Sequence, residues 1–323
     1  YLGLYDENNQ SYCVQFGEKY KGNLNIGFLK EAIIETVANN PSLKAIFRSD
    51  MGKDILQIIP KDAEVDFEYI DLSEEKQMNH ATYCLQYAAD ERSRPFDFSK
   101  GKLLRIKLFK WNDNTYYFLW TNHHIILDGW STSILLAEIK SRHNHKMTNM
   151  PYIQESKPLF SDYIKWLGQQ KESQSIEFWK QKLYGYSHVA EIKSMENHTR
   201  NEAEFYTVDS VFNLSVELTR CLEDKAKRMK KTLNTITQAA YGLLLSYYSK
   251  NDDVVFGAIV SGRPAQVPDI QKMVGLLFNT IPLRVKFHDK GRLSELLGDI
   301  QKYFIESQDY HYLNVADFNK MGL

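Results

Sequence analysis

Residues 116–130 read YYFLWTNHHIILDGW, and this stretch decides the fold that we expect. Its first part, residues 116–122, is rich in aromatic residues and predicts a strand. Helical spacing begins at about residue 132, so His123 and His124 come where a strand ends and shortly before a helix. Because successive side chains of a strand point to opposite faces, one histidine is expected to face a cleft and the other to pack.

The residues after the two histidines supply the other parts of an acyl-transfer site. Asp128 is able to fold back across the turn and pair with an arginine, which would fix the loop. Gly129 permits a positive φ or the close approach of a ligand, and its amide lies near a helix N-terminus. A base candidate, a loop anchor and a backbone donor in one short segment fit acyl transfer. A purely structural turn and helix cap explains the same residues, whereas a metal site is disfavoured because no third ligand lies at a useful spacing.

Strands and helices surround this stretch in an order that predicts a mixed α+β lobe. Apolar or alternating runs bounded by turn residues predict strands at 11–17, 43–48, 55–59, 67–70, 103–110 and 116–122. Helical spacing predicts helices at 27–38, 75–93 and 132–142. Residues 111–115, WNDNT, have the composition of a hairpin loop between two of the strands.

The second half of the chain repeats this order of elements. A polar stretch at 143–161 leads to a helical segment around Tyr163 and Trp166, and residues 193–204 predict a surface loop. Strands are expected at 205–214, 254–260 and 280–287, and helices at 216–229 (capped by Ser215), 233–248 and 293–307. The sequence therefore predicts two similar lobes.

Composition and charge exclude several classes of protein. A chain of 323 residues exceeds the size of one ordinary hydrophobic core, which also favours two lobes. With 40 Lys and Arg against 41 Asp and Glu, the chain is not built around a surface for nucleic acid. No apolar run is long enough to cross a membrane, and three scattered cysteines support neither a disulfide framework nor a zinc site. A reducing, cytoplasmic setting fits this cysteine usage best.

The segment 123–129 has the form H-H-x-x-x-D-G, which resembles the signature of the condensation domains of nonribosomal peptide synthetases. Their superfamily also contains chloramphenicol acetyltransferase. Further segments resemble the motifs of this family in the same order: 39–47 (NNPSLKAIF), 95–105 (PFDFSKGKLLR), 160–166 (FSDYIKW), 274–284 (VGLLFNTIPLR) and 307–310 (SQDY). The resemblance covers almost the whole chain.

The resemblance implies an α+β fold of two chloramphenicol acetyltransferase-like lobes that form a V with a central cleft. The N-terminal lobe, residues 1–170, would hold the motif, and residues 171–323 would form a partial C-terminal lobe. The usual opening segment of the family and everything after the Q-D-Y segment are absent, and the chain lacks an initiator Met. We therefore expect an excerpt of a longer protein, incomplete at both ends of the domain.

The resemblance also implies roles for residues around the motif. His124 would accept a proton from the acceptor amine or orient it, His123 would support the site, and Gly129 would place its amide toward the oxyanion. Asp128 would be structural, with Arg284 as its leading partner and Arg263 as the second. Substrate contacts would come from Trp130, Ser131, Asn279 and Thr280, although a structural turn explains the last two equally well. Gly129-Trp130-Ser131 is typical of condensation rather than epimerization domains, and residues 261–264 with 274–280 favour an L-configured donor.

The implied reaction is attack of an acceptor aminoacyl amine on a donor thioester. Both substrates would arrive on phosphopantetheine arms of donor and acceptor carrier proteins, with an adenylation domain as neighbour. No cofactor bound by the domain, no metal, no nucleic acid and no membrane are implied. A basic cluster on one predicted helix end is either a solvated face or a dock for acidic carriers: Lys225, Lys227, Arg228, Lys230 and Lys231. A partner-recruiting module without catalysis, a free-standing acyltransferase that uses coenzyme A, and ester formation stay open as alternatives.

Overall fold

The structure is a computed structural model that describes residues 12–48, 55–62, 64–148, 151–154, 156–187, 190, 211–288, 291–314 and 317–318. The chain divides into two compact units, one of residues 1–169 with 265–278, the other of 170–264 with 279–323. The predicted lobe boundary after residue 170 differs by one residue from this division. Segment 265–278, however, was expected in the second lobe and packs with the first unit instead.

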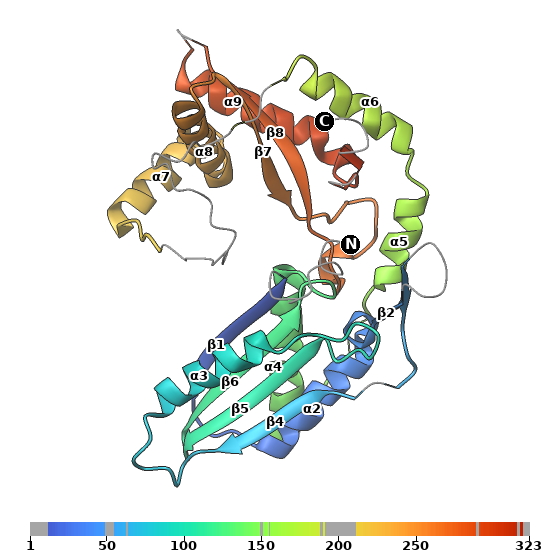
Figure 1. Ribbon diagram of the computed structural model, residues 1–323, viewed down its shortest axis with the longest axis vertical. Helices are drawn as coiled ribbons and strands as arrows, with labels where there is room; N and C mark the ends of the chain where they lie inside the picture. The colour runs from blue at the N-terminus through green and yellow to red at the C-terminus, as the bar shows by residue number, and fades with distance from the viewer. Residues whose placement is uncertain are drawn as a thin grey trace, which may run out of the picture. The chain divides into compact units, whose positions relative to one another are not determined.

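The first unit is built on a four-stranded sheet with the order β1-β6-β5-β4 (Figure 1). Its strands are β1 (Cys13–Lys21), β4 (Asp66–Asp71), β5 (Leu104–Asn112) and β6 (Thr115–His123). β6 pairs antiparallel with both β1 and β5, whereas β4 pairs parallel with β5. The predicted hairpin is therefore confirmed, and its second strand, β6, lies inside the sheet and ends at the histidine pair.

Three helices cover the two faces of this sheet (Figure 1). Even-numbered residues of β5 and β6, such as Ile106 and Trp120, pack with α2 (Ile26–Asn39) and α4 (Gly129–Thr148). Odd-numbered residues, such as Phe109 and Leu119, pack with α3 (His80–Ser93) on the other face. The alternation of a strand thus produces two cores, and the first six residues of β5 are buried on both faces, Arg105 and Lys107 among them.

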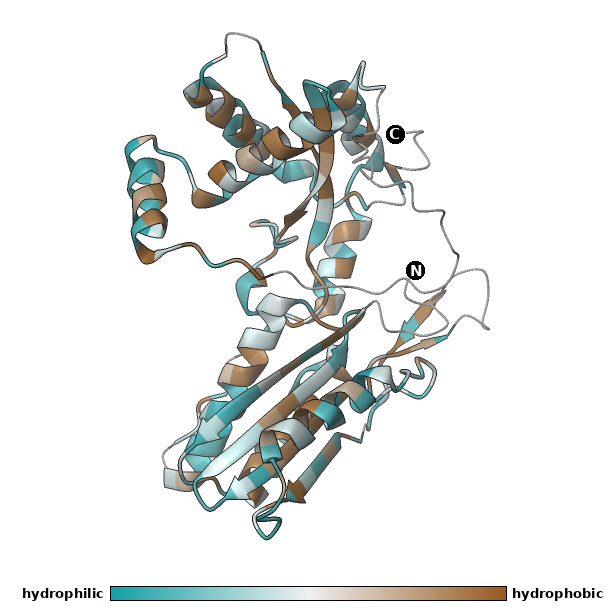
Figure 2. Ribbon diagram, turned by 60° about the vertical axis from the view of Figure 1, so that its left-hand side comes forward, coloured by the Kyte–Doolittle hydropathy of each residue, from teal (hydrophilic) through white to brown (hydrophobic). Residues whose placement is uncertain are grey.

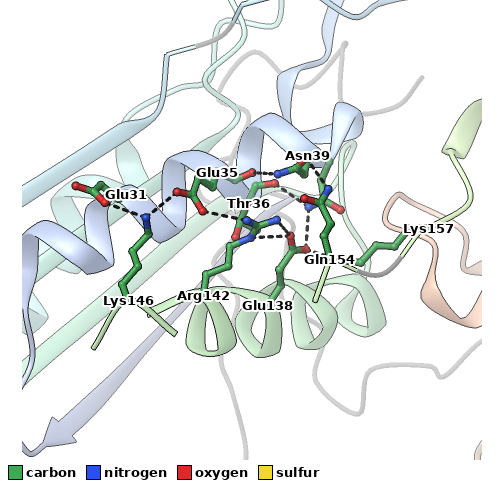
Figure 3. Close-up of polar contacts among 10 residues, drawn as sticks. Glu31, Glu35, Thr36, Asn39, Glu138, Arg142, Lys146, Gln154 and Lys157 are labelled. Carbon is green, nitrogen blue, oxygen red and sulfur yellow. Dashed lines mark hydrogen bonds and ion pairs between the residues drawn. The ribbon is translucent and has the colours of Figure 1, made fainter. Parts of the chain in front are cut away.

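A row of ion pairs and hydrogen bonds joins α2 to α4 (Figure 3). The buried guanidinium of Arg142 donates to Glu35 of α2 at 3.0 Å and to Glu138 of its own helix at 2.9 Å. The row continues through a few further residues of both helices and of the segment that follows α4: Glu31, Lys146, Asn40 and Lys157. Because α4 begins at Gly129, these contacts help to hold the helix that carries the motif.

Shorter elements complete the first unit. Strands β2 (Ile46–Arg48) and β3 (Leu56–Ile58) form a small antiparallel pair, with the 3-10 helix η1 (Pro41–Lys44) before them. Helix α5 (Phe160–Gly168) packs Tyr163 and Trp166 against residues of segment 265–278, which contains the 3-10 helix η2 (Ile270–Lys272). A separate apolar cluster therefore attaches that distant segment to the first unit.

The second unit is built on the antiparallel hairpin of β7 (Asp253–Val260) and β8 (Asn279–Lys286). The apolar residues of β7 are brown in Figure 2. Helices α6 (Glu172–Leu183), α8 (Leu233–Ser249) and α9 (Leu293–Ser307) contribute to the core around this hairpin, and Trp179 of α6 is fully buried in it. A Cβ at Gly242 of α8 would lie 3.2 Å from Val285, so the helix approaches β8 closely because this residue has no side chain.

Most predicted elements of the second half are confirmed, with a few differences. Helix α7 (Val216–Arg228) is capped by Ser215 as expected, and η3 (Gln308–Tyr310) follows α9. Of the strand expected at 205–214, residues 205–210 lie outside the described residues and 211–214 are not in a strand. In the first unit α3 begins at His80 rather than at residue 75, because the Asn79 side chain accepts the Thr82 amide and caps the helix there. None of the helices that the structure describes combines the length and apolarity of a membrane span.

The stability of the second unit is expected to fall between pH 6.5 and pH 4 because of His311. Burial lowers the pKa of this imidazole to about 4, and its Nε2 lies 2.9 Å from the Ser307 hydroxyl. The unfolded chain binds a proton near pH 6.5 and the folded chain only near pH 4, so stability is complete above 6.5 and is lost across that window. The loss attributable to this group is about 3 kcal/mol.

Urea unfolding of wild type and His311→Gln between pH 4 and pH 7 measures this contribution. The free energy of unfolding of the wild type should depend more steeply on pH than that of the variant. Parallel curves for the two proteins would show that His311 does not titrate with a lowered pKa.

Candidate functional site

His123 is the packed member of the histidine pair. It is the last residue of β6, and its backbone amide donates to the Leu103 carbonyl at 2.9 Å. Its side chain is buried between Phe96 and Phe98, with ring centroids 5.7 and 4.7 Å away. Its Nδ1 accepts the amide of Ile125 at 3.1 Å, so the ring supports the turn that follows.

His124 is the partly exposed member, and its contacts set the state of its ring. Nδ1 lies 2.7 Å from the Leu127 carbonyl oxygen. Because a carbonyl oxygen only accepts, Nδ1 must carry the proton, and in the neutral ring Nε2 then has the lone pair. The Phe278 ring meets the imidazole edge to face, with centroids 4.8 Å apart. The turn itself is anchored by the buried side chains of Ile126 and Leu127.

Asp128 is the N-cap of α4 and accepts backbone amides with both carboxylate oxygens. Oδ1 accepts the Ser131 amide at 2.7 Å, and Oδ2 accepts the Leu277 amide at 3.1 Å. The Asp128 amide donates in turn to the Gly275 carbonyl at 3.1 Å. The buried carboxylate therefore joins the start of α4 to segment 265–278, which follows it by more than a hundred residues in sequence.

The predicted pairing of Asp128 with Arg284 is wrong. Arg284 lies in β8 and donates from Nε and Nη2 to both carboxylate oxygens of Asp253, at 2.8 and 2.6 Å. Its Nη1 donates to the carbonyls of Lys182 and Tyr184. This bidentate pair on neighbouring strands fixes the guanidinium within the second unit, and the hydrogen bond to Asp253 raises the pKa of Arg284. Arg263 is buried in the second unit, and its part in supporting Asp128 stays a prediction.

The three residues that open α4 have different surroundings. Gly129 is the first helical residue, and a Cβ there would meet open space, so a ligand has room beside its backbone. Trp130 is 52% exposed, and its Nε1 donates to the Gln271 carbonyl at 3.0 Å. Ser131 is fully buried, and its hydroxyl bonds to the Gly275 backbone. The predicted substrate contact of Ser131 is therefore wrong, whereas that of Trp130 stays a prediction.

Asn279 is a structural residue of the second unit. Its amide nitrogen donates to the carbonyls of His311 and Leu313, both at 2.7 Å, and its side-chain oxygen accepts the Thr280 amide. These bonds hold the segment after α9 against the start of β8 and give Asn279 a structural role, whereas its substrate contact stays a prediction. Thr280 pairs with Ile259 in the hairpin, and its substrate contact stays a prediction.

Residues outside the motif also hold it in place, and the sequence does not indicate this role for them. Ser42 donates to the Val274 carbonyl at 2.9 Å. The Phe160 ring packs so close to Gly275 that a Cβ there would lie 2.4 Å from it. All three segments had been singled out as family motifs. Their order in sequence carried no information about which of them meet in space. Among the described residues no three His, Cys, Asp or Glu side chains come together in a way that would hold a metal ion.

Comparisons with known proteins agree with the motif. The family model described as Condensation domain matches residues 1–321. Bacitracin synthase 1 of Bacillus licheniformis is 34% identical over 318 residues, which is 98% of this chain and 6% of that protein. Tyrocidine synthase 3 of Brevibacillus parabrevis is 30% identical over 95% of this chain. The chain thus spans only a small part of the length of these relatives.

Solved structures show the same fold at low sequence identity. The condensation domain from Monacolin K polyketide synthase MokA is 16% identical, with a TM-score of 0.85 over the whole of this chain and 73% of its own. The first condensation domain of the calcium-dependent antibiotic synthetase, in complex with a substrate analogue, is 15% identical, with a TM-score of 0.79 over 99% of this chain and 75% of its own. The chain is a member of the condensation domain family, which its sequence resembles.

Proposed function

We propose that this chain catalyses amide-bond formation between a donor aminoacyl or peptidyl thioester and the amine of an acceptor. Both substrates are carried on phosphopantetheine arms of carrier proteins, as in a nonribosomal peptide synthetase. The observation that carries the proposal is the state of His124, a partly exposed imidazole whose Nδ1 is held by a carbonyl oxygen so that Nε2 is the acceptor. A general base at this position requires that tautomer.

Each residue of the motif has a different role in the proposed reaction. The acceptor nitrogen attacks the thioester carbonyl, Nε2 of His124 takes the proton from that nitrogen, and the Gly129 amide stabilises the oxyanion. The attack forms the C–N bond, and collapse of the tetrahedral intermediate then re-forms the carbonyl, breaks the C–S bond and leaves a thiolate, which takes up the proton that His124 accepted. Asp128 takes no part in the proton transfer, because both of its oxygens hold backbone amides.

Most of the rate enhancement comes from bringing the two tethered substrates together. An α-amine has a pKa near 8, so a sizeable fraction is already neutral at pH 7. Holding two reactants in the right geometry supplies about 7–11 kcal/mol, whereas a general base contributes about 10²–10⁴-fold. His124 is thus one term in the rate, added to a larger gain from proximity.

The partners of the proposed reaction are a donor and an acceptor carrier protein, with an adenylation domain nearby. The exposed basic side chains at the end of α7, Lys225, Lys227 and Arg228, suit an acidic carrier. An L-configured donor and a cytoplasmic setting complete the proposal.

Competition between matched substrates tests the chemistry of this proposal. The protein that carries this chain is given donor carriers loaded with an L- or a D-aminoacyl group, and acceptor carriers loaded with an amino acid or its hydroxy analogue. Amide formation from the L-donor is expected to dominate. Preferential ester formation would overturn the amide assignment, and preference for the D-donor would overturn the assigned configuration.

A further inference from the structure

Segment 271–278 is attached to the motif, to the start of α4 and to η1 by hydrogen bonds at several of its residues. The Gln271 carbonyl accepts from Trp130, and the Val274 carbonyl accepts from Ser42. The Gly275 carbonyl accepts from the Asp128 amide and from the Ser131 hydroxyl. The Leu277 amide donates to Asp128. We call Ser42, Asp128 and Ser131, which hold the stretch, the clasp.

Ser131 is the member of the clasp that bonds one residue twice. Its hydroxyl donates to the Gly275 carbonyl at 2.9 Å and accepts the Gly275 amide at 3.1 Å. A hydroxyl has one proton to donate, and this bond uses it. The side chain is fully buried on the first turn of α4, so it cannot reach a substrate. Both of these hydrogen bonds are made to the backbone of Gly275.

Phe160 and Ser42 also constrain the segment. A Cβ on Gly275 would lie 2.4 Å from the Phe160 ring, so this ring of α5 packs closely against the Gly275 backbone because the residue has no side chain. Ser42, on η1, fixes the preceding carbonyl, that of Val274, at 2.9 Å. The backbone of residues 274 and 275 is therefore held from three different elements, α4, α5 and η1.

The position of residues 274 and 275 affects His124 through Phe278, which lies three residues after Gly275. Asp128 holds the amide of Leu277, and the next ring, Phe278, meets His124 edge to face at 4.8 Å. The imidazole is thus oriented from two directions, by the Leu127 carbonyl at Nδ1 and by the Phe278 ring. A displacement of residues 274–277 would move the second of these contacts, because Phe278 directly follows them.

We propose that Ser131 and Ser42 are positioning residues for the reaction of His124. They hold residues 274–277 against the motif, so that Phe278 keeps the imidazole in the orientation in which Nε2 meets the acceptor amine. This role rests on the proposed function, because it concerns the geometry of the proposed base. It gives segment 271–278 a task in catalysis although none of its side chains carries chemistry.

Single-turnover kinetics and amide hydrogen exchange on the same variants test this role. Ser131→Ala and Ser42→Ala are compared with wild type and with Ser133→Ala, which removes an exposed hydroxyl that bonds only within α4. Both variants of the clasp should exchange faster in residues 274–278 but not in the second unit. Their maximal rate of product formation should fall about 10- to 100-fold, with the half-saturating acceptor concentration nearly unchanged. The double variant should be little slower than the slower single variant, because Ser42 and Ser131 hold neighbouring residues of one stretch, Val274 and Gly275.

The outcomes separate this inference from the function on which it rests. Faster exchange in residues 274–278 together with the rate of Ser133→Ala would overturn the positioning role and leave the proposed function intact. A changed half-saturating concentration at an unchanged maximal rate would also overturn it, because the clasp would then act on binding. A wild-type protein that makes no product from loaded carriers would refute the proposed function and this role together.

Discussion

His124→Ala is expected to lower the single-turnover rate of peptide formation by about 10²–10⁴-fold at neutral pH. The physical reason is the proposed role of this side chain as a base, since the hydrogen bond of Nδ1 to the Leu127 carbonyl leaves Nε2 as the acceptor when the ring is neutral. Alanine removes that acceptor, and His123 cannot replace it because its ring is buried among aromatic side chains. The gain from proximity of the tethered substrates should remain, so the variant retains residual activity. Rapid-quench sampling with donor and acceptor both loaded measures the rate directly.

A matched control separates this effect from damage to the fold. His80 is a partly exposed histidine at the start of α3 in the same unit, away from the motif, so His80→Ala should react at the wild-type rate. Carrier binding and thermal unfolding of His124→Ala should also match the wild type. An undiminished rate in His124→Ala would show that this histidine is a bystander and that proximity alone accounts for the reaction.

Asp128→Ala is expected to damage both stability and activity. The substitution leaves the amides of Ser131 and Leu277 without their acceptor, and a buried amide without a partner costs about 1–3 kcal/mol. The start of α4 loses its cap, and segment 271–278 loses the bond that precedes Phe278. Asp128→Asn should be intermediate in stability and activity. Its one side-chain oxygen can accept only one of the two amides, and its NH₂ group then faces the other amide, which is also a donor.

Urea unfolding of the first unit measures the cost of Asp128→Ala. Asp90→Ala serves as the control, because Asp90 is an exposed residue of α3 in the same unit. The free energy of unfolding should fall by about 2–5 kcal/mol in Asp128→Ala and by less than about 0.5 kcal/mol in the control. Equal stability of the two variants would mean that the carboxylate does not hold these amides in solution.

Local sequence rules predicted the elements well where the determinants lie close together in the chain. Ser215 caps α7 and residues 293–307 form one helix, because capping and helical spacing depend on neighbours within a few residues. The hairpin of β5 and β6 follows from its turn composition in the same way. The packing of one histidine and the partial exposure of the other follow from the alternation of a strand.

The partners of the site could not be predicted in this way. Arg284 was the leading partner expected for Asp128, but one carboxylate oxygen of Asp128 accepts an amide of a segment whose place in the first unit depends on a separate apolar cluster with α5. Arg284 instead meets Asp253, and this pair depends on the register of β7 with β8, which the sequence pattern leaves open. Ser131 and Asn279 were assigned to substrate because they lie in family motifs, yet each bonds to the backbone of a distant segment.

The transfer of mass between two carrier proteins tests the central claim most directly. A donor carrier with an isotopically labelled L-aminoacyl thioester is mixed with an aminoacyl acceptor carrier and the protein that bears this chain, and intact carriers are weighed after one turnover. If this chain forms the amide, the acceptor carrier gains the mass of the labelled acyl group in a base-stable amide, while the donor carrier returns to its free thiol. Label that stays on the donor carrier, or is released as free acid while the acceptor mass is unchanged, would contradict it.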